Sequence, residues 1–348
     1  MAAAEAGYYQ MLVPEDLGGG GEGAVTMYAS WEAISRRCGP LLWLSHEVLT
    51  HWATGPSHVF RQVHPKMRAD VLPRLMSGTE TLCFAMSEPG AGSDVWMMST
   101  RARADGEGWH LTGTKQWISN GPHADYALVF AVTDPERVRD RDGGISAFLV
   151  PTDAPGFGLD SVISIYGGIG GNHAILSLDE VTVGPEQLVG ELDEGLEIGL
   201  GGISLGRMYN AARSVGYARW GLERALTYTR DRTTFGRPLI ENQGVSFPLA
   251  DSAMEIHAAH LMGLNCAYLL DDGRRALKEA AMAKAYATEM ACRVLDRVMQ
   301  AHGGMGITTE MGFTQAWQDI RTVRIADGSS EMLRRLIVRR LERGDLEL

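Results

Sequence analysis

Apolar residues in the first quarter of the chain recur every three or four positions, which is the spacing of one face of an α-helix. Two such stretches cover residues 27–34 and 41–52, and a third short one ends at Leu75. The VPEDLGGGG segment at residues 13–21 precedes them and has the composition of a loop. The pattern therefore predicts a helical region at residues 1–80.

Between Thr81 and Val189 the pattern changes to short alternating runs separated by Gly and Asp-Gly, such as ADYALVFAV at residues 124–132. Alternation of apolar and polar positions is typical of half-buried β-strands. Residues 81–192 are therefore predicted to form a β-rich middle domain.

From about Ser204 the pattern is helical almost to the end, and apolar residues from Met208 to Leu226 follow one helix face. Further helices are predicted over residues 242–270, 275–302, 314–325 and 329–341. Helices of this length favour an antiparallel bundle, which we expect at residues 193–348. The whole pattern predicts an α+β chain of several domains.

Composition narrows the function classes. The chain has 348 residues, of which 45% are hydrophobic, and a net charge of -11, so several cores are expected and phosphate backbones are poor partners. No apolar run approaches the ~18 residues that would span a bilayer, and the first ten residues lack the features of a signal peptide. The four cysteines show no metal or disulfide spacing, which favours a reducing compartment; they are Cys38, Cys83, Cys266 and Cys292.

Two segments of the β-rich region have the composition of a ligand site. In FAMSEPGAGSD, at residues 84–94, Pro89 fixes the backbone while Gly90 and Gly92 permit conformations closed to other residues. In KQWISNG, at residues 115–121, a strand ends in an aromatic ring, a hydroxyl and an amide. The first segment can present N–H groups to an anionic or planar ligand, although an ordinary turn between strands has the same composition.

Together with later motifs, these two segments resemble the acyl-CoA dehydrogenase family. The resemblance runs in order from about Val13 to the end of the chain, and its first one or two family helices have no counterpart here. The later motifs are DRTTFG at 231–236, Gln243, QAHGGMGI at 300–307 and RIADGSSE at 324–331. The family fold consists of a helical N-terminal domain, a middle β-barrel and a C-terminal four-helix bundle.

The resemblance implies FAD-dependent removal of the α-proton of an acyl-CoA thioester and transfer of the β-hydride to the flavin, which gives a trans-2-enoyl-CoA. An electron-transfer flavoprotein would then accept the electrons. This is a reaction of fatty acid β-oxidation, located in the cytoplasm of a bacterium or in the mitochondrial matrix or peroxisome of a eukaryote. The acyl chain length, branching and oxygenation do not follow from the sequence.

Site residues follow from the same resemblance. The flavin contacts within one subunit would be Phe84, Met86, Ser87, Gly92, Ser93, Trp117, Ser119, Ser329 and Glu331. Residues that reach the flavin of a neighbouring subunit would be Arg232, Thr234, Phe235, Leu239, Asn242, Gln243, Gln300, Gly303 and Gly304. A homodimer at least, and by resemblance a homotetramer, is therefore expected. Substrate contacts would be Ser93, Arg207, Ala326, Asp327 and Gly328.

Asp327 is the candidate catalytic base, at a position where most family members carry Glu. Its backbone N–H would polarise the thioester carbonyl. Asp is shorter than Glu by about 1.5 Å, and a misplacement of roughly 1 Å can cost on the order of a hundredfold in rate. The alternative base position of the family falls on Gly206, ahead of Arg207, and glycine cannot act as a base. From the residues alone, Asp327-Gly328 is better interpreted as a turn before a capped helix, and such a turn is compatible with a role as the base.

Two other functions stay open. Asp as the base also suits a flavin-dependent oxidase of a stronger carbon acid, such as a nitroalkane. A chain that has lost its first helices could instead be a non-catalytic subunit that keeps the fold.

Some patterns resemble other sites but lack their context. The glycine runs at 167–171 and 199–206 do not join a strand to a helix as a dinucleotide-binding loop does, so both are expected to be turns. No metal is expected, because two groups of neighbouring histidines do not have the spacing of metal ligands; they are His46, His51, His58 and His64 in the first group and His257 and His260 in the second.

Overall fold

The structure, a computed structural model, describes residues 5–41, 59–166 and 173–346. Contacts divide these residues into two compact units, one holding residues 5–22 and 59–205 and the other residues 23–41 and 206–346. The predicted helix at 41–52, the GGIGG segment at 167–171 and three of the histidines lie largely or wholly outside the described residues. Those histidines are His46, His51 and His58.

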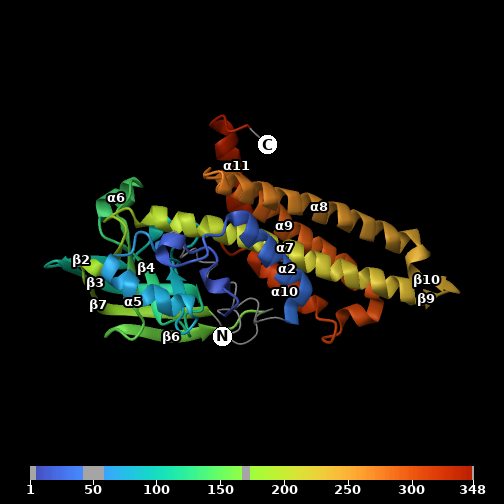
Figure 1. Ribbon diagram of the computed structural model, residues 1–348, viewed down its shortest axis with the longest axis horizontal. Coiled ribbons are helices and arrows are strands. Elements are labelled where there is room, and N and C mark those ends of the chain that lie inside the picture. Colours follow the sequence, from blue (N-terminus) through green and yellow to red (C-terminus); the bar gives the residue numbers. More distant parts are fainter. Residues whose placement is uncertain (1–4, 42–58, 167–172, 347–348) are drawn as a thin grey trace. The chain divides into compact units, whose positions relative to one another are not determined.

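The first unit is built on an eight-stranded sheet (Figure 1). Its strand order is β6-β7-β3-β2-β4-β5-β8, and β1 pairs with β4 in parallel while most other neighbours are antiparallel. The strands are β1 Leu82–Ala85, β2 Arg101–Asp105, β3 Gly108–Ser119, β4 Tyr126–Val132, β5 Ile145–Pro151, β6 Phe157–Ile163, β7 His173–Val183 and β8 Leu188–Val189. Its helices are α5 Pro65–Met76 and α6 Pro135–Asp140, with 3-10 turns at Tyr8–Gln10, Glu15–Leu17, Val95–Met97 and Pro185–Gln187.

Strand β4 is buried along its whole length because both of its faces pack against other side chains. Leu128, Phe130 and Val132 belong to a core that includes Leu72 and Leu75 of α5. The intervening alanines and valine of β4 belong to a second core, formed with β3, β5 and β7. Since successive strand residues point to opposite faces, one sheet separates the two cores.

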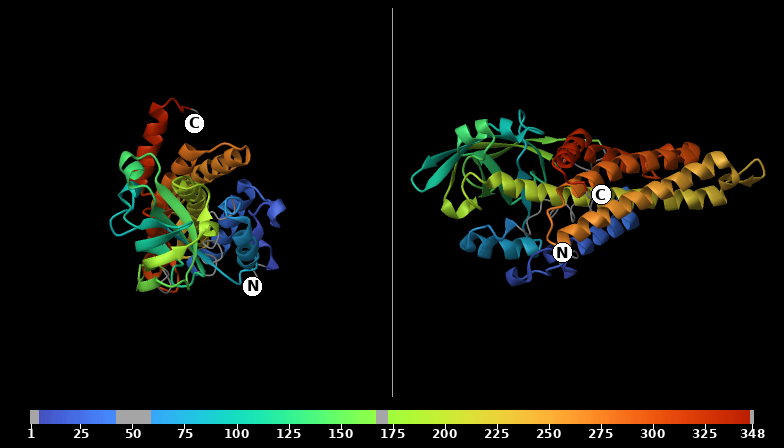
Figure 2. Two further views of the ribbon diagram at one scale, coloured as in Figure 1. Left: turned by 90° about the vertical axis from the view of Figure 1, so that its left-hand side faces the viewer. Right: turned by 90° about the horizontal axis from the view of Figure 1, so that it is seen from above.

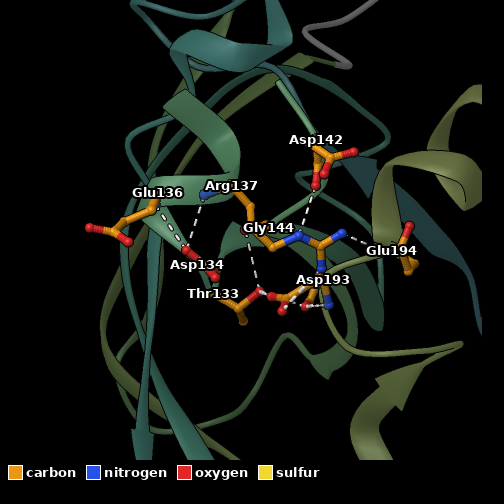
Figure 3. A network of polar contacts seen from close by, with 9 residues as sticks. Thr133, Asp134, Glu136, Arg137, Asp142, Gly144, Asp193 and Glu194 are labelled. Carbon is orange, nitrogen blue, oxygen red and sulfur yellow. Dashed lines mark hydrogen bonds and ion pairs between the residues drawn. The ribbon is translucent and has the colours of Figure 1, made fainter. Parts of the chain in front are cut away.

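A polar network fixes the segment that leads into α7 Gly195–Asp231 (Figure 3). The Arg137 guanidinium donates to Glu194 at 2.8 Å and to the backbone carbonyl of Asp142 at 2.7 Å. The Thr133 hydroxyl donates to the Asp193 carboxylate, next to Arg137. These contacts tie the loop before α7 to the α6 region of the sheet unit.

The second unit consists mainly of helices (Figure 1). They are α2 Ala24–Cys38, the greater part of α7, α8 Gln243–Asp271, α9 Leu277–His302, α10 Phe313–Val323 and α11 Ser330–Glu342. The strands β9 Thr233–Thr234 and β10 Arg237–Pro238 form a hairpin between α7 and α8 (Figure 2). Short 3-10 turns occupy Gly39–Leu41, Leu239–Glu241 and Gly303–Ile307.

Small residues let these helices approach closely. A Cβ atom on Gly216 of α7 would lie 2.5 Å from the Ser35 side chain of α2, and one on Gly263 of α8 would lie 2.3 Å from the Tyr28 ring of α2. The buried side of α9 is rich in alanine, including Ala281 and Ala287. Close helix packing therefore depends on the absence of larger side chains at these contacts.

The expected fold class is confirmed, since a helical N-terminal region, a middle β region and a C-terminal helical region are all present. The predicted helices of residues 242–270, 275–302, 314–325 and 329–341 are present with ends shifted by at most two residues. The domain boundaries at 80 and 192 stay a prediction.

One local prediction is wrong. The glycine run at 199–206 is not a turn but lies inside α7, which begins at Gly195 rather than near Ser204. A Cβ atom on Gly199 would lie 2.2 Å from Cε of Met86. Glycine is used there because the helix approaches the sheet core closely, and this packing outweighs the low helix propensity of glycine.

Candidate functional site

The FAMSEPGAGSD loop begins where β1 ends, in the first unit. It forms a tight turn closed by two hydrogen bonds between the backbones of Glu88 and Ala91, at 2.8 and 3.2 Å. A Cβ atom on Gly90 or Gly92 would have no atom within 4 Å, so the loop is open on that side. The loop thus leaves room for a ligand close to its backbone.

The loop is anchored by an ion pair beneath it. Glu88 accepts from the Lys115 ammonium at 2.8 Å and from Ser99 and Thr100, and both charged side chains are almost completely buried. Lys115 also donates to the Met86 carbonyl at 3.2 Å. Burial alone would raise the pKa of Glu88, but the Lys115 charge and these donors hold it at about 2.

Trp117 lies at a β-bulge of strand β3. Gln116 and Ile118 pair with consecutive residues of β7, so Trp117 is the extra residue, and its φ is 64°. A bulky residue in this left-handed region is strained, and such strain clusters at functional sites. Trp117 is 53% exposed. It lies next to the loop, because the N–H of the preceding residue, Gln116, donates to the Ser87 carbonyl at 2.8 Å.

The other predicted residues of this unit surround the same place. The Ser119 hydroxyl lies 3.1 Å from Nε2 of His173 on β7. Phe84 packs on the ring of Phe130 at 4.9 Å, and Met86 is buried in the core, so Met86 can offer a ligand mainly its backbone. An exposed aromatic face, hydroxyls and an open glycine loop fit the ring system of a flavin.

Asp327 lies in the turn between α10 and α11, in the second unit. Its φ of 53° and that of Gly328, 93°, are left-handed, a conformation that Asp tolerates better than most residues. The cap of α11 is Ser329, whose hydroxyl accepts from the Met332 N–H at 3.4 Å. The Asp327 side chain is therefore not used as the helix cap.

Two helices hold this turn by its carbonyl groups. Buried Lys284 of α9 donates to the carbonyls of Ala326 and Gly328, both at 2.8 Å, and Arg207 of α7 donates to the Asp327 carbonyl at 3.2 Å. Within the described residues the Asp327 N–H donates to no acceptor. With its carbonyls engaged by the protein, the turn has this N–H available for a ligand.

The Asp327 carboxylate accepts from the side-chain amide of Asn210 on α7 at 2.7 Å. Although the residue has open surface, protein atoms crowd the carboxyl group. This desolvation raises its pKa, against the opposing effects of the Lys284 charge, the Asn210 hydrogen bond and Arg207. A raised pKa and a fixed carboxylate are properties of a general base.

The residues predicted to reach the flavin of a neighbouring subunit lie around the β9–β10 hairpin, at the start of α8 and at the C-terminal end of α9. Phe235 lies between strands β9 and β10 with its side chain fully exposed, and Arg237 of the hairpin donates to the side-chain oxygen of Asn242 at 2.8 Å. The side chain of Asn242 donates to the Leu239 carbonyl at 3.0 Å. Most of the other residues are wholly or partly exposed; they are Arg232, Thr234, Gln243, Gln300, Gly303 and Gly304. Glu331 lies in the first turn of α11.

Sequence reasoning missed four residues that hold the glycine loop and the Asp327 turn in place: Glu88, Lys115, Asn210 and Lys284. Glu88 and Lys115 both fall inside the recognised motifs, and a Lys in a strand of otherwise apolar and neutral residues was a signal for a buried pair. Asn210 and Lys284 lie on helices far from Asp327 in sequence, so only the packing reveals them. Among the described residues, no group of three or more His, Cys, Asp or Glu is arranged to hold a metal.

Comparison with known proteins identifies the family. The family models for the N-terminal, middle and C-terminal domains of acyl-CoA dehydrogenases match residues 1–79, 83–181 and 193–342. The chain therefore belongs to the acyl-CoA dehydrogenase family, whose members are FAD-dependent oxidoreductases. This confirms the predicted enzyme class and cofactor.

Individual relatives and solved structures agree with this family assignment. The chain is 37% identical to the human mitochondrial short-chain specific acyl-CoA dehydrogenase, over 97% of this chain and 80% of that protein. The butyryl-CoA dehydrogenase of Megasphaera elsdenii superposes with a TM-score of 0.89 at 27% identity, covering 98% of this chain and 88% of that one. PigA with FAD and proline superposes with a TM-score of 0.92 at 25% identity and the same coverage.

None of the helices in the described ranges is both long and apolar enough to cross a bilayer. The roles of the individual site residues stay predictions.

Proposed function

We propose that this protein catalyses the α,β-dehydrogenation of a short-chain acyl-CoA thioester to the trans-2-enoyl-CoA, with Asp327 as the base. The single observation that carries this proposal is the carboxylate of Asp327, held by Asn210 at 2.7 Å in a turn whose carbonyls are bound from two helices. The preference for a short acyl chain rests on the short-chain and butyryl-CoA relatives.

The chain's own residues supply acid–base and electrostatic chemistry. Asp327 takes the α-proton, and its raised pKa makes the carboxylate a stronger base than an exposed Asp. The Asp327 N–H donates to the thioester carbonyl, where enolate-like charge develops. Arg207, whose guanidinium already contacts the same turn, lies near the pantetheine arm. Bound FAD supplies the two-electron acceptor.

Flavin binding in this proposal uses residues of two neighbouring subunits. Trp117, Ser87 and Ser119 contact the ring system, and the open glycines of the loop admit the ligand to the backbone. A neighbouring subunit contributes Arg232, just before the hairpin, and Phe235 within it. The fully exposed ring of Phe235 supports this role, because it offers an apolar contact surface to a neighbouring subunit.

Electrons leave, in this proposal, to an electron-transfer flavoprotein rather than to oxygen. Support comes from membership of the acyl-CoA dehydrogenase family. By analogy with its mitochondrial and bacterial relatives, we propose a location in the mitochondrial matrix or in the bacterial cytoplasm.

An anaerobic titration of the purified holoprotein tests this function. Acyl-CoAs of increasing chain length are added, and bleaching of the flavin absorbance is followed. We expect rapid bleaching with butyryl-CoA and slower bleaching with long chains. Bleaching by nitroalkanes with no response to any acyl-CoA would overturn the proposal in favour of an oxidase of another carbon acid.

A further inference from the structure

Asn210 is a buried polar residue on α7 whose side-chain amide donates to Asp327 at 2.7 Å. It lies one helical turn after Arg207, so both residues face the turn that carries Asp327. Leaving the amide of a buried Asn unpaired costs free energy, and a carboxylate is the strongest acceptor within its reach. The hydrogen bond from Asn210 therefore fixes the direction of its amide toward the Asp327 carboxylate.

A short carboxylate in a left-handed turn needs such a partner. The side chain of Asp327 has few rotamers, and the backbone of the turn is fixed by Lys284 and Arg207. Of these groups only Asn210 donates a hydrogen bond to the carboxylate itself. Because the amide donates to the charged form, it lowers the proton affinity of the carboxylate and selects one direction for its free oxygen.

We infer that Asn210 is a positioning residue, which holds the Asp327 carboxylate in its reactive orientation and sets the pH at which this carboxylate ionises. This inference rests on the proposed role of Asp327. The other titratable or charged groups that act on Asp327 are Arg207 and Tyr209 on α7 and Lys284 on α9. Arg324 and Glu331, on either side of the turn, act on Lys284.

Two substitutions test the inference. Asn210→Leu removes the donor at similar volume, and Asn210→Asp replaces it isosterically by a second carboxylate. The matched control is Ser214→Ala, one turn further along α7, which removes a buried hydrogen bond to the Asn210 backbone carbonyl without touching Asp327. Two quantities are measured. The first is the pH profile of anaerobic flavin reduction by butyryl-CoA. The second is the infrared titration of the Asp327 carboxyl group without substrate, for which the spectrum of the Asp327→Asn variant is subtracted.

We expect the ascending limb of the profile to move to higher pH in Asn210→Leu, so that the rate on that limb falls about tenfold. Asn210→Asp should shift it further, because two close carboxylates share a proton, and Ser214→Ala should not shift it. The infrared titration should move in the same order. Unshifted profiles and titrations in both Asn210 variants, with changes only in thermal stability, would overturn the inference.

A failure of the proposed function can be distinguished from a failure of the inference about Asn210. If the wild-type flavin is not bleached by any acyl-CoA, the infrared titration alone decides the inference: a shift in the Asn210 variants supports the pairing, and no shift refutes it.

Discussion

Trp117 shows at the scale of one residue how a site departs from what local structure prefers. Its φ of 64° belongs to a region that glycine occupies freely and a bulky side chain occupies with strain, on the order of 1–3 kcal/mol. The exposed indole gains little from packing in return. A strained and exposed tryptophan is best explained by a ligand that covers it.

Substituting Trp117 should therefore separate stability from binding. In Trp117→Gly we expect the apoprotein to keep its stability within about 1 kcal/mol, because the lost side chain is offset by the relieved strain. FAD affinity should fall at least tenfold, since a stacked aromatic contact is lost. Urea unfolding of the apoprotein and a flavin fluorescence titration measure the two effects, with Trp117→Phe as the control that keeps a ring. Unchanged FAD affinity in Trp117→Gly would contradict a flavin contact at this position.

The sequence indicated Trp117 through its motif and Asp327 through its turn, because both are local patterns. It did not indicate Asn210, since nothing in α7 distinguishes a buried Asn that pairs with a residue 117 positions later from one that faces solvent. Long-range polar pairs depend on helix packing, and packing is set by many weak contacts together.

At the scale of elements, the glycine loop owes its position to the Glu88–Lys115 pair below it. The two side chains are 1% and 0% exposed. Removing one partner leaves a buried charge without compensation, which typically costs about 3–5 kcal/mol. The loop and strand β3 are thus joined by charge rather than by apolar packing alone.

We expect Glu88→Gln and Lys115→Met each to destabilise the protein by about 3–5 kcal/mol in urea unfolding, and to lower FAD content, since the loop loses its anchor. The double variant should lose less than the sum of the two, because no unpaired charge remains. Additive losses would show that the two side chains do not interact.

The same pair predicts a pH dependence. The pKa of Glu88 lies near 2 in the folded protein and at its ordinary value of 4.5 when unfolded. A lowered carboxyl pKa contributes stability that is present above about pH 4.5 and is lost as the pH falls toward 2. Stability measured across this window should therefore fall more steeply in the wild type than in the Glu88→Gln, Lys115→Met double variant. Parallel curves would refute this assignment.

Elements were predicted well where the periodicity was long, as for α8 and α9. The error at residues 199–206 arose because the four glycines of this segment were taken as turn residues, whereas Gly199 is required for close packing against Met86 inside a helix. Short strands such as β1 and β8 carry too few residues to show a period.

At the scale of the whole molecule, α8 carries an apolar stripe that the described chain leaves uncovered. Four large side chains spaced seven residues apart are each more than half exposed; they are Phe247, Met254, Leu261 and Tyr268. A seven-residue repeat places them along one helix face, the pattern of a helix that packs on another helix. This stripe supports the proposed oligomer.

Charging the stripe should break the assembly. In a Met254→Glu, Leu261→Glu variant we expect a smaller species in sedimentation, and a loss of bound FAD if a neighbour completes the flavin site. The control is Ala253→Glu, an exposed position on the same helix that points away from the stripe. A variant with unchanged mass and FAD content would exclude this face of α8 as the interface.

The role of Asp327 decides the whole account, and one comparison tests it most directly: the rate of anaerobic flavin bleaching by butyryl-CoA in the wild type and in Asp327→Asn, at matched FAD content. Asn keeps the size of the side chain and its place in the turn but cannot accept the proton. We predict that the rate falls by about 10²–10⁴-fold while FAD stays bound. A rate within tenfold of the wild type would show that another group takes the proton.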